Sequence, residues 1–208
     1  MQLGHNFAVI IPARMGSTRL PNKPLLDIGG IPMVIRVANI CIEAVGREKV
    51  FVSTPDDSII EACNSFNVNS VRSSAECSTG TDRVLEFSLN NDYEFYINVQ
   101  GDEPMLNAEV INQVAFNLVD SCMDVATLCE KIESKELYFD PNCVKVVYNS
   151  GGKALYFSRS PIPAFRNGLD IDLDVCFRHV GLYAYRVGFL KKYFIFEKAF
   201  PQLLFLQH

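Results

Sequence analysis

Short apolar runs recur through the first hundred residues, and each has the composition of a β-strand. The run AVIIPA at residues 8–13 is apolar throughout, which is typical of a strand covered on both faces. Similar runs follow at 49–54, 68–73 and 95–100, the second of these being the weakest. Four strands are therefore expected in this half of the chain.

Stretches with helical spacing separate these runs. Pro32 can open the first helix, whose apolar residues recur at intervals of three and four from Val34 to Cys41. Asp56 or Asp57 is expected to cap the second helix. The other helices are expected at 80–89 and 108–119. This βαβαβαβα order predicts an α/β fold, a Rossmann-like and mainly parallel sheet with helices on both faces.

The texture of the sequence changes near Asp124. The stretches that follow are strand-like, and NSGG at 149–152 is a hairpin turn signal. The second half is therefore expected to extend the sheet with antiparallel strands. We predict a single domain over 1–208, with a nucleotide-binding βα half at 1–123 and a strand-rich half at 124–208.

Composition and charge narrow the class of protein. Hydrophobic residues make up 49% of the 208 residues and charged residues 21%, which is typical of a globular protein. The net charge of −5 argues against nucleic acid as a partner, because such surfaces need a broad basic face. No apolar run approaches the roughly 20 residues of a membrane span. The seven scattered cysteines form no C-x-x-C pair and fit reduced thiols in the cytoplasm.

A cationic loop follows the first strand. Arg14, Arg19 and Lys23 fall within ten residues, and no acid follows Pro12 until Asp27. In an open α/β sheet ligands bind at the carboxyl ends of the strands, so this loop is expected to bind a small anion such as a phosphate. The chain has neither a Walker loop nor G-x-G-x-x-G. The alternative is that these side chains are ordinary solvated loop cations.

An acidic pair follows the fourth strand. In NVQGDEPML (98–106), Asp102 and Glu103 come directly after the apolar run, at the same expected edge of the sheet. Carboxylate oxygens near bound phosphates are ligands that Mg²⁺ prefers. The alternative is that Asp102 caps the helix that begins near Asn107. The loop and the acid together favour a nucleotide–metal site.

Several segments, taken in order, resemble one enzyme family. They are PARMGSTRLPNKPL, STGTDRV, NVQGDEPM, NCVKVV, ALYFSRSPIP and FRHVGLYAYR. The chain resembles the 3-deoxy-manno-octulosonate cytidylyltransferases, or CMP-Kdo synthetases, from about residue 7 to residue 195. The resemblance implies a nucleotide-diphospho-sugar transferase fold and a Mg²⁺-dependent reaction. In that reaction CTP and 3-deoxy-D-manno-octulosonate (Kdo) give CMP-Kdo and diphosphate, for cytoplasmic lipopolysaccharide synthesis.

The resemblance also implies roles for individual residues. The triphosphate would be held by Arg14, Ser17, Arg19 and Lys23. The metal would be bound by Asp102, which is implied to be catalytic together with Lys23 and Arg19. The sugar pocket would be lined by Gln100, Arg159, His179 and Tyr183. Arg83 would lie near the nucleotide.

Each sugar residue also has a structural interpretation. His179, in an apolar strand, could be a satisfied core histidine. Tyr183 follows the period-two spacing of core or interface aromatics, and Arg159 could be a solvated cation. The aromatic residues of 124–186 exceed what one sheet face needs, which predicts a symmetric homodimer.

The C-terminus departs from the family pattern. The resemblance implies a further part that carries a second metal-binding aspartate, and this chain ends FEKAFPQLLFLQH without that motif. One alternative is therefore a catalytically impaired nucleotide-binding protein. Another is a nucleotidyltransferase for a different sugar, which fits the fold but not the segment Ser17–Pro21.

Overall fold

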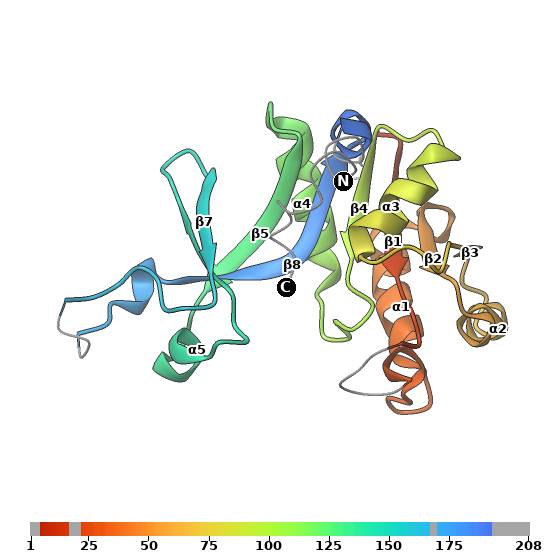
Figure 1. Cartoon of the computed structure of the whole chain (residues 1–208), viewed down its shortest axis with the longest axis horizontal. Coiled ribbons are helices and arrows are strands. Elements are labelled where there is room, and N and C mark those ends of the chain that lie inside the picture. The colour runs from red at the N-terminus through yellow and green to blue at the C-terminus, as the bar shows by residue number, and fades with distance from the viewer. Residues whose placement is uncertain (1–4, 17–21, 167–169, 193–208) are drawn as a thin grey trace. The chain divides into compact units, whose positions relative to one another are not determined.

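The computed structural model describes residues 5–16, 22–166 and 170–192. The chain forms two compact units (Figure 1). The first comprises Met1–Ala126 and Leu182–His208, and the second comprises Thr127–Gly181. Strands β5 (Val125–Lys131) and β8 (Phe177–Arg186) contribute residues to both. The assignment of 1–208 to a single domain, divided after residue 123, stays a prediction.

A parallel sheet lies at the centre of the first unit. Its strands are β1 (Phe7–Pro12), β2 (Val50–Thr54), β3 (Ser70–Arg72) and β4 (Phe95–Val99), in the spatial order β3-β2-β1-β4. Residues Leu182–Arg186 of β8 pair with β4 in the antiparallel direction. All of β4 is buried, as the continuous apolar run predicts for a strand covered on both faces.

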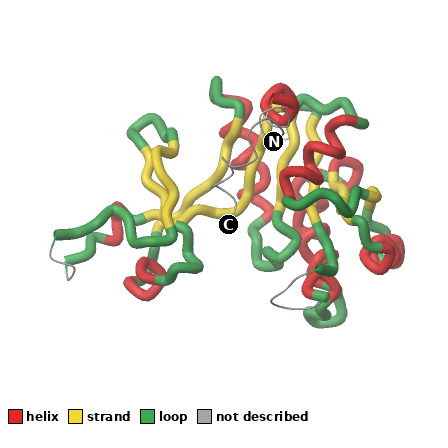
Figure 2. The backbone as a smooth tube through the Cα atoms, viewed as in Figure 1, coloured by secondary structure: helices red, strands yellow, loops and turns green. Residues whose placement is uncertain are grey.

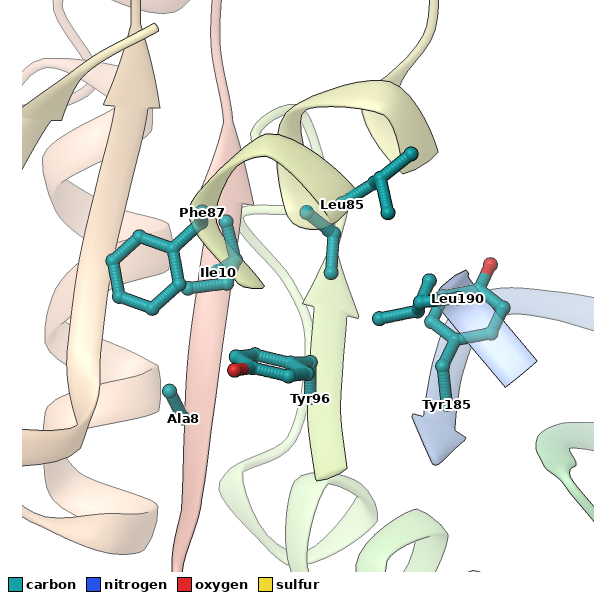
Figure 3. Packing of buried hydrophobic residues seen from close by; sticks show 8 residues of the cluster. Ala8, Ile10, Leu85, Phe87, Tyr96, Tyr185 and Leu190 are labelled. Carbon is teal, nitrogen blue, oxygen red and sulfur yellow. The ribbon is translucent and has the colours of Figure 1, made fainter. Parts of the chain in front are cut away.

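Helices cover both faces of this sheet. They are α1 (Met33–Val45), α2 (Asp57–Ser65), α3 (Gly80–Leu89) and α4 (Ala108–Asp120), with the short η1 (Lys23–Leu25) and η2 (Arg47–Lys49) between strands. On one face, Leu85 and Phe87 of α3 pack with Ile10 and Tyr96 of the sheet (Figure 3). On the opposite face, α1 and α4 pack against each other (Figure 1). The predicted Rossmann-like arrangement is confirmed.

The helix starts largely follow the sequence signals. Pro32 immediately precedes α1, whose buried residues lie between Val34 and Cys41 as expected. The second start differs. Asp56 stands at the N-cap position of α2, but its side chain makes no capping hydrogen bond. The predicted side-chain cap is therefore wrong for Asp56, and its carboxylate binds elsewhere, as described below.

Strands and loops make up most of the second unit (Figure 2). Strands β6 (Lys145–Tyr148) and β7 (Ala154–Ser158) form an antiparallel hairpin, and β6 also pairs with Phe177 and Arg178 of β8. Asn149 Oδ1 closes the hairpin by accepting from the amides of Gly151 and Lys153, at 3.0 and 2.9 Å. The predicted NSGG turn and the antiparallel strands are both confirmed.

A small core stabilises the rest of the second unit. Ile132, Tyr138 of α5 (Lys135–Phe139) and Cys176 form this core, next to the short η3 (Leu173–Val175). The Tyr138 hydroxyl donates to the Pro163 carbonyl at 2.7 Å and so satisfies its polar end. Across both units, none of the described helices is long and apolar enough to cross a membrane.

Candidate active site

A cavity of about 610 Å³ lies in the first unit, where β1 and β4 end. Its walls come from the segments after these two strands, from η1 and from the start of α3. The lining residues are Pro12, Ala13, Arg14, Gly16, Lys23, Pro24, Ser78, Thr79, Gly80, Arg83, Gln100, Gly101 and Asp102. The cavity therefore lies at the sheet edge where an open α/β fold binds ligands.

Two glycines let the walls approach each other. A Cβ at Gly101 would lie 3.0 Å from the Pro12 carbonyl oxygen, and one at Gly80 would lie 3.3 Å from Pro12 Cγ. Larger residues at these positions would push the loop after β4 and the start of α3 away from the end of β1. The shape of the cavity thus depends on small residues beside Pro12.

The cationic loop contributes to the wall of this cavity. Arg14 and Lys23 both line it, as the phosphate-binding prediction requires. Ser17 and Arg19 lie outside the described residues, so their predicted roles stay predictions. Lys23 Nζ lies 2.5 Å from Asp102 Oδ2, and the two side chains are 34% and 48% exposed. This ion pair joins the loop after β1 to the loop after β4.

Asp102 does not cap the following helix. The cap of α4 is Asn107, whose Oδ1 accepts from the Glu109 amide at 2.9 Å. The capping alternative for Asp102 is therefore wrong, and its carboxylate faces the cavity and Lys23. The described residues contain no cluster of three or more His, Cys, Asp or Glu that could hold a metal. Mg²⁺ is ordinarily held by one or two carboxylates beside water and substrate oxygens, so one carboxylate such as that of Asp102 suits this ion, and its metal-binding role stays a prediction.

The start of α3 is fixed by its own side chains. Thr79 accepts from the Asp82 amide at 3.2 Å, and Asp82 Oδ2 accepts from the Thr79 amide at 2.7 Å. Ser78 also donates its hydroxyl to Asp82 at 2.8 Å. This capping box orders the start of α3, where Ser78, Thr79 and Gly80 line the cavity.

Arg83 supports the loop that borders the cavity. It is only 3% exposed, and its guanidinium donates to Ser73 Oγ, to the Ser74 carbonyl and to the Cys77 carbonyl at 2.8, 2.9 and 3.1 Å. Arg83 also lines the cavity. Its predicted place near the nucleotide stays a prediction. Its contacts with the loop at residues 73–77 could not be predicted from the sequence.

Asp56 is a residue that sequence reasoning assigned to another role. Its Oδ2 accepts from the Met15 amide at 2.8 Å, and Met15 lies within the cationic loop. The contact joins the loop after β1 to the segment after β2. The adjacent pair Asp56–Asp57 could have indicated this contact. A helix needs only one N-cap residue, so the second aspartate is available for another partner.

The predicted sugar residues fall in both units. Gln100 lines the cavity of the first unit. Tyr183 also belongs to the first unit, where its ring stacks on Tyr185 with centroids 5.8 Å apart. Burial raises the pKa of Tyr183 to about 12, so its hydroxyl stays protonated near neutral pH.

Arg159 and His179 belong to the second unit. Arg159 follows β7, and its Nη1 donates to the Pro141 carbonyl at 3.0 Å. His179 Nε2 lies 2.9 Å from Thr127 Oγ1, and its ring packs edge-on against Phe157. Burial lowers the pKa of His179 to about 4, so the imidazole is neutral near pH 7. His179 thus has the contacts of a satisfied histidine, and its sugar-binding role stays a prediction.

Comparison with known proteins identifies the class to which this fold and site belong. The family described as cytidylyltransferase matches residues 8–204. A 3-deoxy-manno-octulosonate cytidylyltransferase of Ruthia magnifica is 48% identical over 198 residues, which are 93% of this chain and 80% of that protein. The enzyme of that name from Vesicomyosocius okutanii is 48% identical over 191 residues, 90% of this chain and 78% of that protein.

A solved structure agrees. It is CMP:2-keto-3-deoxy-manno-octonic acid synthetase complexed with CTP, which is 38% identical, with a TM-score of 0.85, over 95% of this chain and 83% of that one. The chain is therefore a nucleotidyltransferase of the cytidylyltransferase family. Within that class it belongs with the 3-deoxy-manno-octulosonate cytidylyltransferases, which confirms the predicted family. None of these comparisons favours the alternative of an impaired nucleotide-binding protein.

Proposed function

We propose that this protein transfers the cytidylyl group of CTP to Kdo. The observation that supports this most strongly is a single cavity in which a cationic loop meets a carboxylate, with Lys23 Nζ 2.5 Å from Asp102 Oδ2. Nucleotidyl transfer needs a cation for the phosphate oxygens and a hard oxygen ligand for a metal ion. We infer the identity of the nucleotide, CTP, and of the sugar, Kdo, from the names of the relatives and from the CTP complex of one of them.

The reaction forms one bond and breaks one bond at the α-phosphorus. The anomeric hydroxyl oxygen of Kdo bonds to that phosphorus, the bond to the leaving diphosphate breaks, and the hydroxyl proton passes to solvent water. Arg14 and Lys23, together with Ser17 and Arg19, hold the triphosphate and offset its charge. Such transfer depends on positioning and charge neutralisation more than on covalent catalysis.

Asp102 is the residue that would hold Mg²⁺. The ion, when bound, stabilises negative charge on the phosphate oxygens. One oxygen of Asp102 accepts from Lys23. The Lys23 ammonium has three donors, so it would be able to share them between this carboxylate and a phosphate oxygen.

We infer roles in sugar binding for Gln100 and Tyr183 of the first unit and for Arg159 and His179 of the second, as the family resemblance implies. Kdo carries a carboxylate, and a guanidinium such as that of Arg159 is the side chain best suited to bind one. His179 is neutral near pH 7, because burial lowers its pKa to about 4. His179 would therefore form hydrogen bonds with sugar hydroxyls and leave the carboxylate charge to Arg159.

A symmetric homodimer is also part of this proposal. The second unit exposes large apolar side chains, and two adjacent residues of β7, Leu155 and Tyr156, are 63% and 61% exposed. Phe139, Tyr148 and Val175 of the same unit are also exposed. Exposed apolar clusters mark interaction surfaces, and two-fold pairing is the commonest way to cover them.

The cytoplasm is the proposed site of the reaction. All seven cysteines are free thiols, and two of them, Cys122 and Cys129, are exposed. Exposed free thiols are typical of proteins in a reducing compartment. CTP is a cytoplasmic metabolite, which is consistent with the same location.

Diphosphate release from CTP, Kdo and Mg²⁺ tests the proposed function. The unaltered protein should release diphosphate only when all three are present. Lys23→Ala and Arg19→Ala should each weaken CTP binding by about 1.5–3 kcal/mol, because each removes a charge-assisted contact. Lys153→Ala, at an exposed lysine of the second unit, is the matched control. CTP binding without diphosphate release would reject the transfer, and unchanged CTP affinity in both loop variants would reject the phosphate assignment.

A further inference from the structure

Lys145 is a fully buried lysine that the proposed chemistry does not use. It begins β6 and has 0% exposed surface. Its Nζ donates to the carbonyl oxygens of Asp140, Cys143 and Arg159 at 2.8, 2.6 and 2.7 Å. A buried ammonium is costly unless its donors are satisfied, and here three carbonyls match the three donors.

These three carbonyls belong to two separate segments of the second unit. Asp140 and Cys143 lie in the loop between α5 and β6, whereas Arg159 directly follows β7. Lys145 is opposite Ser158, the last residue of β7, in the β6–β7 pairing, and Arg159 is the next residue along the chain. The ammonium therefore ties the end of β7 to the loop before β6.

Arg159 is held to the same loop by its own side chain. Its Nη1 donates to the Pro141 carbonyl at 3.0 Å, between the two loop residues that Lys145 binds. The main chain and the side chain of Arg159 are thus both attached to residues 140–143. Without the ammonium, the carbonyl of Arg159 would lose its contact with Lys145, and the loop would lose two.

We propose that Lys145 is a positioning residue that sets the orientation of the Arg159 guanidinium for the substrate carboxylate. This inference rests on the proposed function, because that function assigns Arg159 to the sugar. Charge-assisted recognition of a carboxylate depends on guanidinium geometry, so a shift of the Arg159 backbone weakens sugar binding even when Arg159 is present. Lys145 itself touches neither substrate.

Steady-state kinetics of Lys145→Met test this role. Methionine keeps the length of the side chain and removes the ammonium. We expect the KM for Kdo to rise by roughly tenfold, the factor that corresponds to the loss of one charge-assisted hydrogen bond. The KM for CTP should stay unchanged, because the described CTP-binding residues lie in the first unit. Lys153→Met, at an exposed lysine of the β6–β7 turn, is the control and should change neither KM.

A double-mutant cycle separates positioning from a general loss of structure. If Lys145 acts through Arg159, adding Lys145→Met to Arg159→Ala should raise the KM for Kdo little further. The proposal would be overturned if the two substitutions raised the KM for Kdo independently, so that their factors multiplied in the double variant. An equal rise in the KM values for Kdo and CTP would overturn it as well. If Lys145→Met no longer binds CTP and has lost its fold, Lys145→Arg carries the same comparison, with a smaller rise for Kdo expected and an unchanged KM overturning the role.

Amide hydrogen exchange provides a readout that needs no activity. In Lys145→Met, peptides that cover 140–144 and 158–162 should exchange faster than in the unaltered protein, while those of the first unit should not. Unchanged exchange in both segments would overturn the proposal. An unaltered protein that releases no diphosphate would instead reject the proposed function, and the exchange experiment would still decide whether Lys145 holds Arg159.

Discussion

At the scale of single residues, the site depends on which partner each charged side chain has. Asp102 binds Lys23 and leaves the cap of α4 to Asn107. Asp102 thus contributes to the cavity and Asn107 caps the helix, although the two residues are only five positions apart and the sequence alone does not show which does which. Function and stability should therefore respond to different substitutions in this loop.

Asp102→Ala should abolish turnover with little change in the free energy of unfolding. A partly exposed ion pair contributes only about 0–1 kcal/mol to stability, and no capping bond is lost. Asn107→Ala is the matched control. It should lower stability by about 1 kcal/mol, the usual value of an N-cap, and leave turnover largely intact. Thermal unfolding and diphosphate release measure the two effects, and normal turnover in Asp102→Ala would remove this residue from the active site.

His179 should make stability depend on pH. Its folded pKa of about 4 lies below the usual value of 6.5, so between these values the unfolded chain binds a proton that the folded protein does not. Stability is therefore complete above about pH 6.5 and falls as the pH drops towards 4, by at most about 1.4 kcal/mol per pH unit. Urea unfolding across this range should show a shallower fall in His179→Gln. Identical slopes in both proteins would show that His179 is not buried in its neutral form.

At the scale of elements, the cationic loop after β1 is held by the segment after β2. Asp56 stands at the start of α2 and accepts from the Met15 amide, so the helix start positions the loop although it does not cap itself. Neighbouring parallel strands bring these two segments to one edge of the sheet.

Asp56→Ala should therefore raise the KM for CTP. The loss of one hydrogen bond to a carboxylate corresponds to about 1.5 kcal/mol, or roughly tenfold in affinity if all of it served to order the loop. Asp57→Ala is the matched control, because Asp57 pairs with Arg72 at an exposed position and does not contact the loop residues described here. Equal KM values for CTP in the two variants would contradict a role for Asp56 in holding the loop.

Local sequence signals predicted the helices and strands more successfully than they predicted contacts between distant side chains. The helix expected at 80–89 is found at Gly80–Leu89, because the Thr79–Asp82 capping box and the spacing of the apolar residues act within one or two turns. The contacts of Arg83 and Lys145 could not be predicted in this way. Both bind main-chain carbonyls, which every residue has, so the sequence does not indicate which carbonyls come near.

At the scale of the whole molecule, the second unit exposes as many large apolar side chains as the first among the described residues, although it is much the smaller unit. The second unit has a small buried core and several exposed aromatic and aliphatic side chains on β6, β7 and the helices beside them. Small cores stabilise a chain weakly, and a partner that covers the exposed side chains would add buried area.

The protein should sediment as a dimer at micromolar concentration. Tyr156→Glu should shift it towards monomer, because a buried unpaired carboxylate is costly at an apolar interface. Leu89→Glu is the control, since Leu89 is 57% exposed on α3 of the first unit. A monomeric unaltered protein would reject the dimer, and equal effects of both variants would place the interface elsewhere.

The ion pair between Lys23 and Asp102 has a thermodynamic consequence for the order of events in the cavity. The contact engages one oxygen of Asp102 and one donor of Lys23, so each side chain competes with a ligand for part of the other's binding capacity. A triphosphate that draws Lys23 away frees the carboxylate, and a cation that captures the carboxylate frees the lysine. Nucleotide and ion should therefore bind with positive cooperativity, and by linkage each must strengthen the affinity of the other by the same factor.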